Sequence, residues 1–113
     1  MNTRALGTRA ERRAAWYYRL RGYRLLAANA RAGGNELDLV VRRGRRLVFV
    51  EVKQKSGEAF GAPAEMVTEE KQRRIRRAAR AWLSAHPDLD ELEVDFDVLT
   101  VSSRGIERLE LMF

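Results

Sequence analysis

The sequence predicts an α/β domain with the order helix, three strands, helix, two strands. Two stretches carry apolar residues at helical spacing, and three predicted strands lie between them, of which the second and third are rich in Val, Leu and Phe. Two more alternating runs close the chain. A length of 113 residues indicates one domain over 1–113. A chain of this size buries roughly two-thirds of its unfolded surface, which is enough for a core without disulfides.

The first helix is expected from about Thr8 to Arg21, with Gly22 at the position that a helix C-cap favours. Its apolar stripe comprises Ala10, Ala14, Tyr17 or Tyr18 and Leu20, and its solvated side Arg9, Arg12, Arg13 and Arg19. Residues 23–30 are predicted as a strand, 33–35 as a turn, and 36–41 and 47–53 as the strands of a hairpin.

Residues 54–67 contain two glycines and a proline and are expected to form an irregular loop. The second helix is predicted from the N-cap Thr68 to about Ala85, with an apolar side comprising Ile75, Ala78, Ala79, Trp82 and Leu83. Residues 94–101 alternate as a strand, 102–105 form a turn, and 106–113 are predicted as an edge strand.

The hairpin carries acids where a buried strand is normally apolar. Side chains alternate along a strand, so Glu51 and Lys53 share a face about 7 Å apart. A two-residue loop, 43–44 or 44–45, makes the numbers of cross-strand partners add up to 87 or 89, and either register puts Asp38 on that same face. Carboxylates so close repel each other unless a cation lies between them.

An alternative interpretation treats Asp38 and Glu51 as strand-end residues that pair with Arg42, Lys53 or helix arginines. The spacing of the trio, inside strands otherwise made of Val, Leu and Phe, favours a site over this alternative.

Composition limits which partner and which metal ion the protein is expected to bind. The net charge of +6 and pI near 10.5 fit a polyanionic partner, chiefly nucleic acid, although an arginine-rich composition alone would give the same charge. There is no cysteine and one histidine, His86, so oxygen ligands and Mg²⁺ or Mn²⁺ are favoured over Zn²⁺. No apolar stretch suits a membrane span or a signal peptide, and a cytoplasmic location is expected.

Several motifs carry a resemblance to a known family. Residues 34–38 (Gly-Asn-Glu-Leu-Asp) and 51–53 (Glu-Val-Lys) resemble the PD-(D/E)xK nuclease signature. Together with 7–11, 48–53, 60–61, 68–71 and 95–98, they resemble the YraN-like uncharacterised bacterial family over nearly the full length. Ala10 and Asn35 stand where that family has glycine, and Asp95 where it has arginine. The resemblance implies a restriction-endonuclease-like fold, a mixed five-stranded sheet flanked by helices.

That family is in turn similar to archaeal Holliday-junction resolvases, and this likeness implies Glu11 as a fourth catalytic residue beside Asp38, Glu51 and Lys53. From the residues alone, Glu11 is a helix-start acid in a capping box with Thr8. The implied Mg²⁺ (or Mn²⁺) ligands are Asp38, Glu51, the carbonyl of Val52, and Glu11 directly or through water. Lys53 would orient or deprotonate a water, or stabilise charge on the phosphate.

The second helix is strongly basic on one side, with no acid from residue 71 to 80. A solvated face explains part of this charge, and phosphate contacts are assigned to Lys71, Arg73, Arg74 and Arg77. Phe60 either stacks on a base or packs locally, and packing is preferred.

Three functions compete. The first is a metal-dependent endonuclease acting on DNA, with branched or damaged DNA as substrate. The second is a non-catalytic nucleic-acid-binding module of the same fold. The third is a structural partner that uses the edge at 106–113, where Leu109, Leu111 and Phe113 favour an interface. A homodimer would suit a two-fold DNA junction. The acid and lysine set favours the nuclease.

Overall fold

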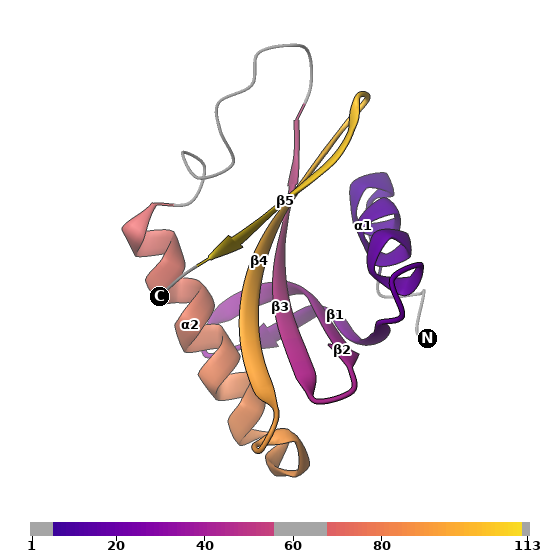
Figure 1. The fold of residues 1–113 in the computed structure, drawn as a ribbon. Helices are drawn as coiled ribbons and strands as arrows, with labels where there is room; N and C mark the ends of the chain where they lie inside the picture. Colours follow the sequence, from indigo (N-terminus) through magenta and orange to yellow (C-terminus); the bar gives the residue numbers. More distant parts are fainter. Residues whose placement is uncertain (1–5, 56–67, 112–113) are drawn as a thin grey trace.

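A five-stranded mixed sheet with a long helix against each face organises the protein (Figure 1). The structure is a computed structural model, and it describes residues 6–55 and 68–111. The predicted α/β class and the order of elements are confirmed. The elements are α1 (Arg9–Arg19), β1 (Arg24–Ala32), β2 (Asn35–Arg43), β3 (Arg46–Gln54), α2 (Glu69–Ser84), a 3-10 turn η3 (Pro87–Leu89), β4 (Glu93–Ser102) and β5 (Gly105–Leu111).

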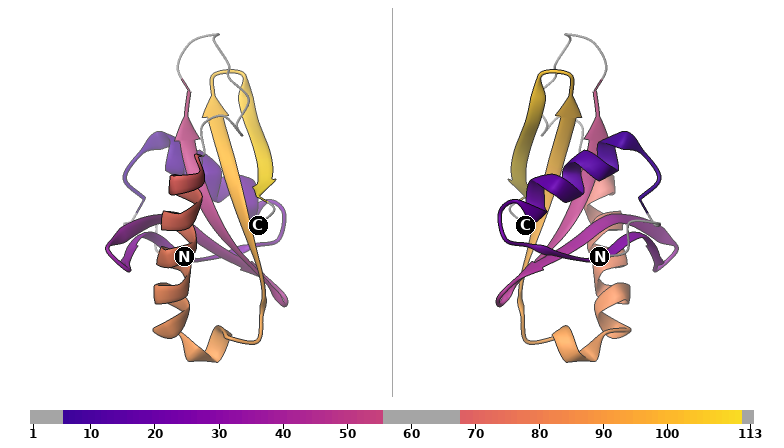
Figure 2. Two further views of the ribbon diagram at one scale, coloured as in Figure 1. Left: turned by 90° about the vertical axis from the view of Figure 1, so that its left-hand side faces the viewer. Right: turned by 90° about the vertical axis from the view of Figure 1, so that its right-hand side faces the viewer.

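The strands lie in the sheet in chain order, β1-β2-β3-β4-β5. Every neighbouring pair is antiparallel except β3 and β4, which are parallel. Parallel neighbours need a crossover rather than a tight turn, and α2 lies in the segment between them. Views from the two sides show α2 in front of one face of the sheet and α1 in front of the other (Figure 2).

The hairpin register is one of the two that the sequence left open. Arg43 pairs with Arg46 and Leu39 with Val50, so partner numbers add up to 89 and residues 44–45 form the loop. Gly44 has a φ of 59°, a left-handed conformation that glycine adopts without steric cost. Extended by alternation, this register would bring Asp38 and Glu51 to the same face, but the regular pairing ends at Leu39 and Val50.

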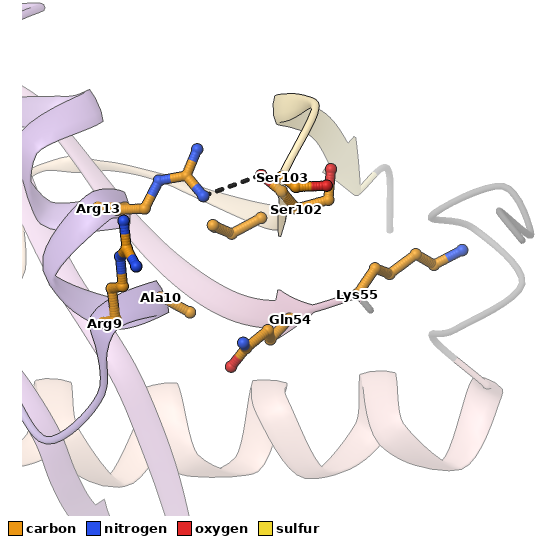
Figure 3. A pocket seen from close by; sticks show the side chains of 8 residues that line it. Arg9, Ala10, Arg13, Gln54, Lys55, Ser102 and Ser103 are labelled. Carbon is orange, nitrogen blue, oxygen red and sulfur yellow. Dashed lines mark hydrogen bonds between the residues drawn. The ribbon is translucent and has the colours of Figure 1, made fainter. Parts of the chain in front are cut away.

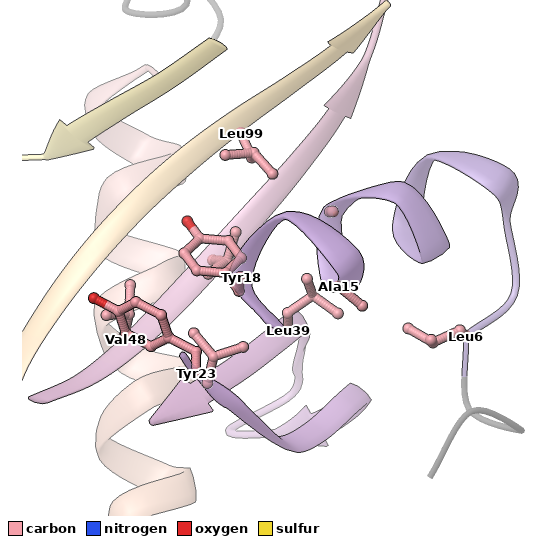
Figure 4. Close-up of a cluster of buried hydrophobic side chains, with 10 residues drawn as sticks. Leu6, Ala15, Tyr18, Tyr23, Leu39, Val48 and Leu99 are labelled. Carbon is pink, nitrogen blue, oxygen red and sulfur yellow. The ribbon is translucent and has the colours of Figure 1, made fainter. Parts of the chain in front are cut away.

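Alternation along the strands divides the core into two layers. On the α1 face, Leu39, Val48 and Leu99 pack with Ala15 and Tyr18 of the helix (Figure 4). On the other face, the cluster comprises Leu37, Val40, Leu47, Phe49, Ala78, Ala79, Trp82 and Leu89. Each helix therefore covers a different set of strand residues, and a polar residue on either face has a defined helix opposite it.

Both helices begin where the sequence predicts. The Thr8 hydroxyl accepts a hydrogen bond from the Glu11 amide at 3.0 Å, and the Thr68 hydroxyl accepts one from the Lys71 amide at 3.2 Å. Several expectations need correction: α1 ends at Arg19 and Leu20 of the predicted apolar stripe is 76% exposed, β1 runs to Ala32, β3 extends through Gln54, β4 spans Glu93–Ser102, and η3 follows α2. Phe60 and Phe113 lie outside the described residues. Within the described chain, no helix combines the length and apolarity that a membrane crossing requires.

Packing within the protein accounts for some of the apolar residues of the edge strand β5. β5 is the last strand of the sheet, as predicted, and Leu109 and Leu111 pack half-buried against Ile75 and Val98. Core packing therefore accounts for part of the pattern that favoured an interface. The homodimer remains a prediction.

Candidate active site

The ladder between β2 and β3 changes its hydrogen bonding at Asp38. Regular pairing stops at Leu39 and Val50. Beyond this pair the Asp38 carboxylate accepts a hydrogen bond from the Val52 amide, with Oδ2 at 2.8 Å from N. A side chain thus replaces a backbone carbonyl as the acceptor, which fixes the carboxylate between the two strands. The predicted metal contact of the Val52 carbonyl is not tested by this bond.

Glu51 and Lys53 lie on the α2 face, as alternation from Phe49 requires. Lys53 Nζ is 3.1 Å from Glu51 Oε1, and Lys71 Nζ, from α2, is 4.0 Å from the same oxygen. The sequence grouped Lys71 with arginines that contact phosphate. The structure instead places it beside the acid and lysine pair of β3, because α2 starts above this end of the strand.

Glu11 reaches the same region through Asn29, which sequence reasoning missed. The Asn29 side-chain amide donates a hydrogen bond to Glu11 Oε2. Asn29 has a φ of 49°, a conformation that asparagine tolerates better than most residues. Its neighbours Ala28 and Ala30 pair with Leu39 and Leu37, so Asn29 lies level with Asp38. A single asparagine in an alanine-rich strand was the available signal.

Burial and the neighbouring acids shift the pKa of Asp38. Burial, followed by the charge of Glu51, raises the pKa of Asp38 to about 6, and the charges of Glu11 and Glu36 act in the same direction. The Val52 amide opposes this rise. The three predicted carboxylates therefore interact electrostatically even though they come from α1, β2 and β3.

The two lysines share an environment that does not favour two full charges. The pKa of Lys71 is lowered, first by its hydrogen-bond contact with Lys53 and then by burial and the charge of Lys53. Burial acts to lower the pKa of Lys53 as well, but its contacts with Lys71 and Glu51 raise it. Lys53 is thus the more firmly charged amine of the pair.

The donor set suits a cation that needs few protein ligands. No group of three or more His, Cys, Asp or Glu side chains that could enclose a metal is found in 6–55 and 68–111. Mg²⁺ is often held by only one or two carboxylates together with waters and substrate phosphates. Asp38 and Glu51 fit that mode, whereas a closed structural site of the zinc type does not fit.

The other predicted phosphate contacts differ from Lys71. Arg73 and Arg77 are exposed on α2. Arg74 is also exposed and forms an ion pair with Glu70 at 2.7 Å, which is weak at a surface and easily exchanged. Their assignment to phosphate stays a prediction.

The fold and the site define a class, a one-domain α/β protein with acids from three elements and two lysines gathered beside a mixed sheet. The chain belongs to the Uncharacterised protein family UPF0102, whose model matches residues 10–101. This confirms the family resemblance found in the sequence.

Relatives from distant bacteria match over most of their length. A UPF0102 protein of Nitrobacter winogradskyi is 43% identical over 90% of this chain and 85% of its own length. One from Syntrophotalea carbinolica is 46% identical over 91% of this chain and 83% of its own. One from Frankia casuarinae is 47% identical, covering 94% and 91%.

Proposed function

We propose that this protein is a Mg²⁺- or Mn²⁺-dependent nuclease that acts on DNA, with branched or damaged DNA as the substrate class. The observation that carries the proposal is the electrostatic influence of Glu51 and Glu11 on Asp38, whose pKa is raised to about 6 by burial and by these acids, together with Lys53 and Lys71 beside Glu51. Such like-charge crowding costs stability and is typical of functional sites.

The residues have separate tasks in this proposal. Asp38 and Glu51 would hold the ion, with the Val52 carbonyl and Glu11 completing the set. When bound, the ion supplies an activated water and neutralises charge on the phosphate. Lys53, 3.1 Å from Glu51, orients that water or stabilises the charge that develops on the phosphate oxygens. Asn29 holds the Glu11 carboxylate, and Arg73, Arg74 and Arg77 bind backbone phosphates.

The test is cleavage of linear, flapped, four-way and single-stranded DNA, with an RNA arm, in Mg²⁺ or Mn²⁺. Asp38→Asn and Lys53→Ala are expected to lower the rate by about 100-fold or more, the usual cost of losing a group that stabilises the transition state. Glu93→Gln is the matched control, since Glu93 is exposed at the start of β4.

The outcomes separate the candidate functions. Cleavage that is equal in wild type and in both site variants comes from a contaminant and overturns the proposal. Absence of cleavage on every substrate, with DNA binding retained in all variants, would identify a non-catalytic nucleic-acid-binding module.

A further inference from the structure

A second site lies on the α1 face, behind the acids. A cavity of about 230 Å³ opens between the first turns of α1, the end of β3 and the turn after β4 (Figure 3). Its lining residues are Arg9, Ala10, Arg13, Gln54, Lys55, Val101, Ser102 and Ser103. Pockets for drug-sized ligands measure about 300–1,000 Å³, so this cavity suits a smaller group.

The lining selects for an anion. Three of the eight residues carry positive charge and none is acidic. The remaining polar groups are one amide and two hydroxyls, which are common partners of phosphate oxygens. A neutral or cationic ligand would leave the charges of Arg9 and Arg13 uncompensated.

Arg9 and Arg13 give the strongest indication. They are four residues apart on α1, where like charges face each other and destabilise the helix. No ion pair joins either guanidinium to an acid within the described residues. The sequence placed Arg13 on the solvated side, but it is half-buried, and its Nη1 donates to the Ser102 carbonyl at 2.9 Å (Figure 3). That bond uses one of five N–H donors and fixes the rest at the cavity.

The cavity adjoins the candidate active site through two elements. Arg9 and Arg13 belong to the same first turns of α1 as Glu11, although side chains two residues apart point to different sides of a helix. Lys55 follows Lys53 by two residues, about 7 Å along the chain direction of β3, and its amide is anchored to the Val101 carbonyl at 2.9 Å. A group bound in the cavity therefore lies near the end of β3 that carries Glu51 and Lys53, on the side of the sheet that α1 covers.

We propose that this cavity binds a phosphate group, and that in the working protein this phosphate belongs to the nucleic-acid strand adjacent to the point of cleavage. The nucleic-acid source of the phosphate rests on the proposed function, whereas phosphate binding in the cavity does not. The phosphate is either an internal phosphodiester or a strand-terminal phosphate, since both present the same oxygens.

Inorganic phosphate tests the cavity directly. It is titrated into ¹⁵N-labelled protein in EDTA, and the Ser103 and Lys55 amides and the Arg13 side chain are followed by NMR. Saturable shifts confined to these groups are expected. Arg9→Gln should raise the dissociation constant several-fold, and Arg12→Gln, an equal change of charge at an exposed position of the same helix, should leave it unchanged. Absent or non-saturating shifts, or equal effects of the two variants, overturn the proposal.

Oligonucleotide binding distinguishes the two phosphate sources. Affinity is measured by fluorescence anisotropy in EDTA with 5′-phosphorylated, 3′-phosphorylated and unphosphorylated strands. Each lost contact should weaken binding about 5–8-fold at 0.1 M salt and reduce the salt slope by about 0.7–0.9. Losses in Arg9→Gln and Lys55→Gln on all strands indicate an internal phosphodiester, and losses confined to phosphorylated strands indicate a terminal group. Wild-type affinity of both variants on every strand overturns the inference.

Failure of this inference and failure of the proposed function can be told apart. Neither binding measurement involves metal or cleavage. Phosphate shifts that Arg9→Gln abolishes, in a protein that cuts no substrate, would support the cavity and remove only the nuclease. Cleavage of DNA without any shift on addition of phosphate would support the nuclease and remove only the phosphate site in the cavity.

Discussion

Asp97 in β4 and Asp38 in β2 are both withdrawn from water, but their surroundings are opposite. Asp97 is 2% exposed, and its carboxylate accepts the Tyr18 hydroxyl at 2.6 Å and Arg108 Nη1 at 3.1 Å. Asp38 accepts one backbone amide and faces the acids Glu51, Glu11 and Glu36. One acid is neutralised by partners and the other is crowded by like charges.

The comparison teaches how to separate a structural acid from a functional one. A buried charge is tolerated when hydrogen bonds and an opposite charge satisfy it, and Asp97 meets both conditions. The partners act mutually: burial and then the Asp97 charge raise the pKa of Tyr18, so its hydroxyl stays protonated as a donor. Asp38 forms no ion pair among residues 6–55 and 68–111, and a bound cation would stabilise its charge.

The largest effect is expected at Asp97. Asp97→Ala leaves the Tyr18 hydroxyl and the Arg108 guanidinium without their shared acceptor, and breaking a buried pair in this way costs about 3–5 kcal/mol. Urea denaturation at pH 7.5 measures the free energy of unfolding. Glu93→Ala, at an exposed position, should change it by less than about 0.5 kcal/mol. A loss at Asp97 as small as that of the control would contradict the structural role.

A smaller loss is expected for Tyr18→Phe. The ring keeps its edge contacts with Tyr17 and Tyr23, at 5.1 and 5.4 Å between centroids, so only the hydroxyl is removed. A hydrogen bond to a charged acceptor contributes about 1.5–3 kcal/mol. In the Asp97→Ala background the same change should cost less, because its acceptor is already gone. Additive losses in the double variant would show that the two groups do not interact.

These two acids also mark what sequence can predict. Alternating apolar residues, caps and the two-residue loop predicted the elements, their order and two possible registers of the hairpin, one of which is observed, since all of these follow from local geometry. The strand containing Asp97 alternates in the same way as the hairpin. Its partners lie 79 and 11 residues away, on α1 and β5, and no local pattern identifies them.

The part of the candidate site that lies on neighbouring strands was predictable from the sequence, and the part that depends on helix packing was not. Asp38, Glu51 and Lys53 come from neighbouring strands, and the shared side of Glu51 and Lys53 follows from alternation along β3, whereas the Asp38 contact with the Val52 amide lies beyond the regular pairing. Glu11 required a family resemblance, because its approach depends on how α1 packs on the sheet and on Asn29 at a positive φ. The closeness of Lys71 to Glu51 was not predicted, since the position of α2 over β3 is a tertiary property, and its phosphate contact stays a prediction.

At Asp38 a substitution that removes the charge should stabilise the protein, which is the opposite of the effect expected at Asp97. The folded-state pKa of about 6 exceeds the usual value of 3.8, so the folded protein holds this proton more tightly, and stability from this group falls as pH rises from about 4 to 6. In EDTA, Asp38→Asn keeps an acceptor for the Val52 amide and removes the charge. It should stabilise the protein by about 1–2 kcal/mol at pH 7.5, after allowance for partial exposure, and have no effect at pH 4. Destabilisation at both pH values would show that Asp38 resembles Asp97.

The smallest expected effect is the rise in stability on Mn²⁺ binding, which tests whether an ion relieves the repulsion between the acids at the candidate active site. Mn²⁺ at about five times its dissociation constant adds about 1 kcal/mol to the stability of a protein that binds it only when folded, or about 4 °C in Tm for a chain of this size. Wild type and Glu93→Gln should show this rise at pH 7.5, and Asp38→Asn should not, because the variant has already lost the repulsion that the ion relieves. The gain should shrink below pH 6, where protonation of Asp38 competes with the ion. An equal rise in all three proteins would place the ion elsewhere and contradict the metal site that we propose at the carboxylates of β2 and β3.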